Sequence, residues 1–211
     1  HTHLSGTGIG DLGDILFMPV SGNTTIKRGT IENPEEGYMA LYTHDKEQAR
    51  PGYYSVEIDR YNLLAELTTS TRVGFHRYTF RENDQANVII DLERGIGWDA
   101  PVETHLEWLN DSTITGSRFS KGWAEDQRIF FAAVFSSPVR DFTIYDEDQP
   151  TGARSAKGKQ LKAIASFGNS FGGSLLVKAG ISPVSTENAL DNISAEIPHW
   201  DFDRVATEAD A

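Results

Sequence analysis

The sequence predicts an all-β fold, a sandwich or barrel of short strands, followed by two helices. Strand-like segments recur about every ten residues, with turn residues between them. In several of these segments apolar and polar residues alternate; in the segment 53–59 every second residue is apolar. After residue 184 apolar residues recur at helical spacing instead. A β-domain followed by helices explains all three observations.

The strands expected in chain order are 15–20, 38–44, 53–59, 63–69, 72–80, 87–92, 102–109, 113–120, 129–136, 141–145, 161–167 and 174–181. The segment 129–135 is apolar on both faces, which predicts a central strand. The segment 149–159 contains Pro150, Gly152 and Gly158, and it is expected to be a mobile loop.

The helical part begins with N-cap residues in the segment 185–188, and Pro198 is expected to end the first helix. A second helix should begin near Asp201. We therefore expect a β-domain over residues 1–183, incomplete at its start, and a helical linker over 184–211. Both ends of the sequence have the character of interior points of a longer protein.

The charge balance excludes some partners. Lys and Arg number 19 against 31 Asp and Glu, a formal net charge of −12. Nucleic acids and anionic membranes need a basic surface, so neither is expected as a partner. No apolar run approaches the roughly 20 residues of a membrane-spanning segment. Cysteine is absent, which excludes disulfides and thiolate metal sites.

The first nineteen residues contain the densest functional pattern of the chain. Gly6, Gly8, Gly10 and Gly13 predict a loop with unusual backbone angles or close backbone approach to a ligand. No lysine follows the glycines and no strand precedes them, so neither the P-loop nor the dinucleotide fingerprint fits. Two aspartates nearby would also repel a phosphate. A neutral, hydroxyl-rich ligand suits the loop better.

Individual residues of this pattern allow more than one role. His1 and His3 have a spacing that can chelate a transition metal, but no third ligand is near in sequence. Asp11 and Asp14 can cap turns, bind calcium or hold ligand hydroxyls. As an acid–base pair these aspartates are weak candidates.

The tryptophans and the remaining histidines also allow more than one role. Trp123 lies in a loop before the expected central strand, where an indole can stack on a sugar or cover the core. Trp98 is a weaker case of the same kind. Trp108, His76 and His105 alternate within strands and are expected to be structural.

Several motifs resemble those of glycoside hydrolase family 92. The longest is HTHLSGTG at residues 1–8, continuing through GDLGD at 10–14 to Met18-Pro19. The others follow in the family's order: PGYY at 51–54, AELT at 65–68, TRVGFHRY at 71–78, GSR at 116–118 and GWA at 122–124. The resemblance covers nearly the whole chain.

This resemblance implies a bacterial, exo-acting, calcium-dependent α-mannosidase that inverts anomeric configuration. It implies a large antiparallel β-sandwich of the supersandwich type, similar to galactose mutarotase, followed by an (α/α)6 barrel. The active site would lie between the two domains. The catalytic carboxylates and most calcium ligands belong to the barrel, so no catalytic residue and no metal ligand is assigned here. The partners implied are mannose-containing glycans and the barrel of the same protein.

The glycine loop and the indole are then expected to contact substrate. The candidate substrate-binding residues are His1, Thr2, His3, Ser5, Gly6, Asp11 and Trp123. Two other functions stay open: a stand-alone carbohydrate-binding module and a purely structural domain. The glycan substrates of the family imply a periplasmic, cell-surface or secreted location. The chain alone is expected to be inactive.

Overall fold

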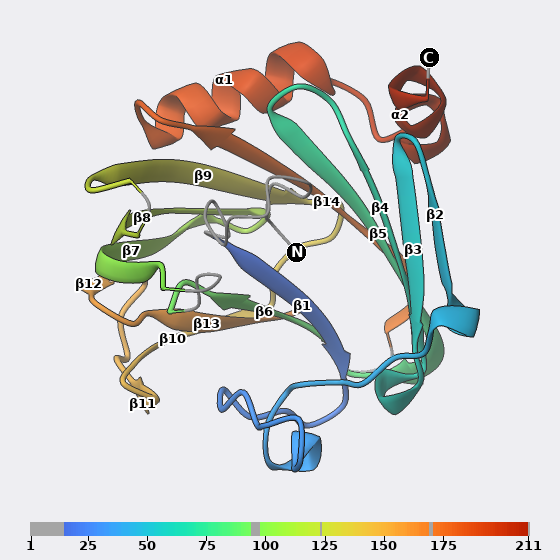
Figure 1. The fold of residues 1–211 in the computed structure, drawn as a ribbon, viewed down its shortest axis with the longest axis horizontal. Coiled ribbons are helices and arrows are strands. Elements are labelled where there is room, and N and C mark those ends of the chain that lie inside the picture. The colour runs from blue at the N-terminus through green and yellow to red at the C-terminus, as the bar shows by residue number, and fades with distance from the viewer. Residues whose placement is uncertain (1–14, 94–97, 123, 169–170, 211) are drawn as a thin grey trace.

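The computed structural model describes residues 15–93, 98–122, 124–168 and 171–210. Within these ranges the strands form two antiparallel sheets, and two helices follow them (Figure 1). The all-β sandwich predicted from the sequence is therefore confirmed. None of the described helices is long and apolar enough to cross a membrane.

The smaller sheet has the strand order β1-β6-β13-β10-β11. Its strands are β1 (Leu16–Ser21), β6 (Ala86–Asp91), β13 (Lys162–Ser166), β10 (Asp141–Asp146) and β11 (Gln149–Pro150). The larger sheet has the order β12-β7-β8-β9-β14-β5-β4-β3-β2. Its strands are β12 (Ser155–Gly158), β7 (Ala100–Asn110), β8 (Thr113–Lys121), β9 (Gln127–Phe135), β14 (Phe171–Ser182), β5 (Val73–Asp84), β4 (Leu63–Thr69), β3 (Tyr53–Ile58) and β2 (Glu47–Arg50).

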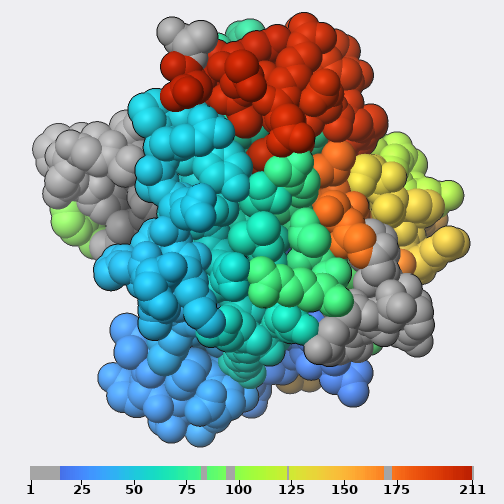
Figure 2. All heavy atoms as spheres, turned by 90° about the vertical axis from the view of Figure 1, so that its right-hand side faces the viewer, coloured from blue at the N-terminus to red at the C-terminus, as the bar shows by residue number. Residues whose placement is uncertain are grey.

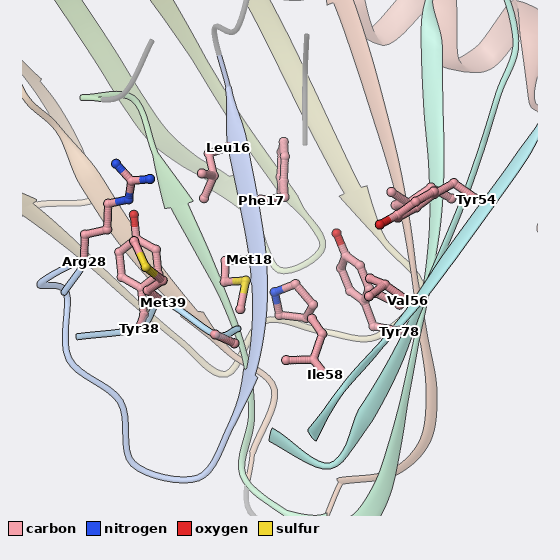
Figure 3. Close-up of a pocket in the computed structure, with 14 residues that line it drawn as sticks. Leu16, Phe17, Met18, Arg28, Tyr38, Met39, Tyr54, Val56, Ile58 and Tyr78 are labelled. Carbon is pink, nitrogen blue, oxygen red and sulfur yellow. The ribbon is translucent and has the colours of Figure 1, made fainter. Parts of the chain in front are cut away.

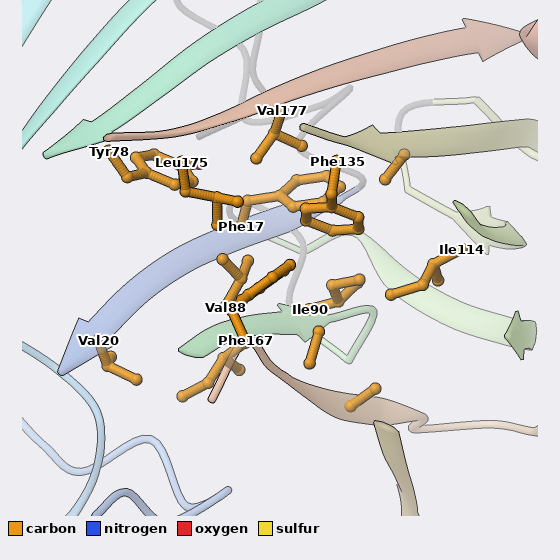
Figure 4. Close-up of a cluster of buried hydrophobic side chains, with 14 of the residues drawn as sticks. Phe17, Val20, Tyr78, Val88, Ile90, Ile114, Phe135, Phe167, Leu175 and Val177 are labelled. Atoms are coloured by element: carbon orange, nitrogen blue, oxygen red, sulfur yellow. The ribbon is translucent and has the colours of Figure 1, made fainter. Parts of the chain in front are cut away.

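The main core lies between the two sheets. Phe17, Val88 and Ile90 from the smaller sheet face Leu175 and Val177 from the larger one (Figure 4). Alternation along each strand sends every second side chain into this layer, where apolar burial stabilises the fold. The strand β9 lies inside the larger sheet, as its apolar character on both faces predicts.

The two helices cover part of the outer face of the larger sheet. α1 (Thr186–Glu196) packs on β9 and β14, and α2 (Phe202–Ala209) packs on β4 and β5. In Figure 2, α2 lies over one end of the face formed by β2 to β5. The buried residues of this second cluster are Val73, Phe75, Ala132, Ala189, Ile193, Ile197, Phe202, Val205 and Ala206. The helices therefore rest on an apolar surface that the sheet would otherwise expose.

Local signals set the helix starts and one tight turn. The Ser185 hydroxyl accepts a hydrogen bond from the Asn188 amide at 3.1 Å, which confirms the predicted N-cap. Gly52, with φ +69°, follows Pro51 in the turn between β2 and β3. A Cβ at Gly52 would lie 2.6 Å from the Ala209 backbone, so only glycine lets this turn approach the end of α2.

Two local predictions were wrong. Residues 38–43 form no strand; this segment follows the short 3-10 helix Pro34–Glu36, and Tyr38 is buried beside the smaller sheet. The segment 149–159 contains β11 and β12, because its backbone pairs with β10 and β7. The domain boundary between residues 183 and 184, and the role of 184–211 as a linker, stay predictions.

Candidate functional site

All seven candidate substrate-binding residues lie outside the described part of the chain. These residues are His1, Thr2, His3, Ser5, Gly6, Asp11 and Trp123. Their contacts therefore stay predictions. The described residues next to them nevertheless show which end of the sandwich these segments adjoin.

Pairing across the smaller sheet places the start of β1 at the end of β6. Leu16, which follows the glycine segment, pairs with Asp91, and Asp91 pairs in turn with Lys162 of β13. The chain then leaves β6 through Leu92 and Glu93. The start of β1 and the connection from β6 to β7 therefore share one end of the sandwich.

A buried charge pair joins the larger sheet to this same end. Arg118 of β8 donates from Nε to the Leu92 carbonyl at 2.9 Å, and its Nη2 lies 2.6 Å from Oδ2 of Asp99. Both side chains are 0% exposed. Arg118 points inward like Ile114, since the two are an even number of residues apart on one strand. The inner face of β8 thus carries apolar packing at Ile114, and at Arg118 an ion pair with the start of β7 and a hydrogen bond to the chain that leaves β6.

Asp99 also contacts the segment before Trp123. A Cβ added to Gly122 would lie 3.0–3.2 Å from atoms of Asp99, so the two backbones approach closely. Ala100 pairs with Lys121 directly beside this contact. Leu16, Asp99 and Gly122 therefore bring together, at one end, the described borders of the three segments that the sequence singled out.

Trp98 lies at this end and is 62% exposed. A large exposed indole beside a buried ion pair offers a flat apolar surface on a held backbone, the geometry that sugar stacking uses. Trp98 was the weaker of the two loop tryptophans in the sequence analysis. Among the described residues it is the best-placed aromatic side chain for contact with a sugar.

A second polar cluster lies at the same end, around Asp91 of β6 and Lys162 of β13. The Tyr38 hydroxyl donates to Oδ2 of Asp91, and Asp91 Oδ1 accepts from the Glu93 amide at 2.8 Å. Burial and the Asp91 charge raise the pKa of Tyr38, which keeps its hydroxyl protonated. Lys162 lies 2.6 Å from Glu93 and 2.9 Å from Asp148. Burial alone would lower the pKa of Lys162, but hydrogen bonds to these carboxylates outweigh it and raise the pKa.

A mostly apolar cavity lies inside the sandwich and reaches Leu16 at the start of β1. It measures about 280 Å³ and lies between β1 and the inner face of β3 to β5 (Figure 3). Met18, Val56 and Ile58 are typical of its lining, while Arg28 and Tyr38 approach it from the other side of β1. The three tyrosine hydroxyls of its lining already bind Asp91, Glu47 and His76, so few polar groups are left to hold sugar hydroxyls. We therefore place the candidate site at the end marked by Arg118.

Calcium does not fit the described residues. No group of three or more His, Asp or Glu side chains that could hold a metal occurs among them. Calcium takes six to eight oxygen ligands, and a carboxylate-rich group of that kind is not among the described residues.

The structural histidines behave as the sequence suggested. Burial lowers the pKa of His76 to about 3, and its Nδ1 lies 2.7 Å from the Tyr78 hydroxyl inside the core. His105 pairs with Ser155 at the edge of the larger sheet. Asp99 carries no signal in the sequence, and Arg118 appears there only within the GSR motif at 116–118. The sequence signal for the buried pair was an arginine on the same face of the expected strand as Ile114, four residues away.

The comparisons with known proteins agree with the motifs. The family model described as the glycosyl hydrolase family 92 N-terminal domain matches residues 1–182. The chain belongs to glycoside hydrolase family 92. No match was found among curated proteins.

Solved structures of this family are similar over almost the whole chain. The family GH92 α-mannosidase BT3965 from Bacteroides thetaiotaomicron is 38% identical over 99% of this chain, with a TM-score of 0.93. The same α-mannosidase was also solved in complex with mannoimidazole. The inverting mannosidase BT2199 from the same organism, at 20% identity over 92% of this chain and 25% of its own, shares the fold with a TM-score of 0.77. This family 92 chain spans only 29% of the length of BT3965.

Proposed function

We propose that the protein containing this domain is an exo-acting α-mannosidase that removes α-mannosyl residues from glycans, N-glycans among them. The observation that carries this proposal is the 38% identity to a family 92 α-mannosidase over 99% of the chain. The mannoimidazole complex of that relative supports a mannose-like ligand.

We further propose that this sandwich supplies substrate contacts, while the catalytic carboxylates belong to an (α/α)6 barrel of the same protein. An inverting glycosidase needs one carboxylic acid to protonate the leaving oxygen and a second carboxylate to activate water on the opposite face. The convergence of Leu16, Asp99 and Gly122 at one end supports a shared cleft there. His1, His3 and Asp11 would bind hydroxyls, and Trp123 would stack on the ring.

Calcium dependence and export are part of the same proposal. Because the described residues offer no calcium ligand group, calcium would be held chiefly by the barrel. Glycans of the size that such enzymes trim are met outside the cytoplasm, which favours a periplasmic, cell-surface or secreted bacterial enzyme.

The test uses the full-length protein with aryl α-mannosides and α-mannobiose. We expect hydrolysis whose first product, followed by proton NMR, is β-mannose, and loss of activity on chelation that calcium reverses. Absence of α-mannoside hydrolysis would sink the proposal, and α-mannose as first product would remove its inverting part.

A further inference from the structure

The outer face of the smaller sheet carries a polar hollow that runs along β10 from Asp141, at the end opposite the candidate site, to Tyr145, which is in register with Lys162. It measures about 180 Å³ and lies over β6, β13 and β10, beside the turn at residues 22–24. These three strands lie side by side in the lower part of Figure 1. The side chains used below are Asn87, Asp141, Thr143, Tyr145 and Ser166.

The floor of the hollow is held in a fixed arrangement. Asn87, Ser166 and Asp141 stand in one row across the three strands. The Ser166 hydroxyl donates to Oδ1 of Asn87 at 2.5 Å, and Asn87 Nδ2 donates to the Gly22 carbonyl at 3.0 Å. Asn87 and Ser166 are both buried. The amide is therefore oriented before any ligand arrives, which reduces the entropic cost of binding.

The wall on β10 presents three different groups in succession. Asp141, Thr143 and Tyr145 are two residues apart, so they share the outer face of the strand. The Thr143 hydroxyl lies 3.4 Å from Oδ2 of Asp141. Asp141 is exposed, and Tyr145 is half-buried. A carboxylate, a hydroxyl and an aromatic ring thus line one side.

This combination matches a sugar better than an ion. Carboxylate and amide oxygens accept hydrogen bonds from neighbouring hydroxyls, and an aromatic ring packs on the apolar face of a pyranose. No Lys or Arg lines the hollow, so a phosphate or sulfate would meet only the repelling Asp141. Its volume is below the roughly 300 Å³ of typical drug-sized pockets, which suits a single sugar ring.

We propose that this hollow is a second, non-catalytic binding site for one neutral hexose residue of a glycan. The biological role of this site rests on the proposed function. The site would hold a part of the glycan away from the bond being cleaved. Leu16 lies at the candidate active end, and Ser21 lies beside the Asn87 end of the hollow. Five strand steps separate them, roughly 17 Å, so another branch of the same glycan can span the two sites.

The experiment measures binding of the full-length protein to immobilised α-mannan and dextran by affinity electrophoresis. The variants are Asp141→Asn, which keeps the shape of the side chain, and the double variant Asp141→Ala with Thr143→Val. Asp191→Ala is the matched control, because Asp191 is an exposed carboxylate on α1 outside the hollow. Unfolding midpoints of all variants are compared with that of the wild type.

We expect both hollow variants to bind at least one polysaccharide about fivefold or more weakly, while Asp191→Ala binds as the wild type does. Equal retention of wild type and folded hollow variants overturns the proposal, as does a wild-type protein that neither polysaccharide retards. Hydrolysis of aryl α-mannosides by the wild type is measured separately. Its absence would sink the proposed mannosidase activity and leave the retention result interpretable for the hollow.

Discussion

At the residue scale, Arg118 and Asp99 form a buried ion pair at one end of a mainly apolar sandwich. Both side chains are fully buried, and the arginine also binds the Leu92 carbonyl. Burying two charges is costly, and the cost is recovered only when both partners stay in place. The ion pair therefore holds Asp99, at the start of β7, to β8, and the hydrogen bond to Leu92 links Arg118 to the chain that leaves β6 in the smaller sheet.

Changing Asp99 to Asn should destabilise the protein by about 3–5 kcal/mol, because it leaves the Arg118 charge buried without its counter-ion. Chemical unfolding measures the loss. Asp126→Asn is the control, since Asp126 pairs with Arg128 on the surface and should give no measurable change. Equal stability of the two variants would contradict a structural role for the buried pair.

His76 should make stability depend on pH above the range in which carboxylates titrate. Burial lowers its pKa to about 3 in the folded state, against about 6.5 when unfolded. Only the unfolded state then gains a proton between these values, so stability is full above pH 6.5 and falls as the pH is lowered. His76→Gln keeps a hydrogen-bonding group near Tyr78. In this variant the unfolding midpoint should depend less on pH between pH 6.5 and 4.5. An unchanged slope would show that His76 is not neutral in the fold.

At the scale of elements, Arg77 adds polar contacts to the apolar packing of α2 on the larger sheet. Arg77 of β5 binds both oxygens of Glu66 at 2.6 Å, reaches Asp203 of α2 at 3.0 Å and lies over the Phe202 ring at 4.3 Å. Glu66 is buried, so this network joins the interior of the sheet to the start of the helix.

Replacing Arg77 with Met keeps apolar contact with Phe202 but removes the charged hydrogen bonds. Such bonds contribute about 1–3 kcal/mol each, so amides of 203–209 should exchange with solvent roughly tenfold faster. Hydrogen exchange measures this, with the β14 amides as an internal reference. Arg204→Met is the control, because Arg204 pairs with Glu208 within α2. Equal exchange in both variants would show that packing alone holds the helix.

The order and type of most elements could be predicted because alternation and turn residues are local. The alternation of Leu63, Ala65 and Leu67 predicts β4, and the N-cap residue Ser185 predicts the start of α1. Residues 38–43 were mistaken for a strand because their weak alternation has no partner strand, and pairing is not local. The pair of Arg118 with Asp99 could not be predicted, since nothing in sequence shows which charges a fold will bury. The glycine loop and Trp123 were predicted from composition and resemblance, and their contacts stay predictions.

At the scale of the whole molecule, we propose that this domain recognises the substrate and that another domain cleaves the bond. Residues 1–211 alone should therefore not hydrolyse aryl α-mannosides, because the catalytic carboxylates are expected in the barrel. Release of the aryl group is followed by absorbance against a heat-inactivated sample. Turnover above that sample would place a complete catalytic pair in this chain.

The central claim, that the glycine loop of this domain contacts the mannoside, is tested most directly by kcat/KM of the full-length enzyme for α-mannobiose. His3→Ala and Asp11→Ala should each lower kcat/KM about tenfold or more, since a lost hydrogen bond to a charged or polar group in a dry site costs about 1–3 kcal/mol. Asp191→Ala should leave it unchanged. Wild-type kinetics in folded His3→Ala and Asp11→Ala variants would contradict the claim.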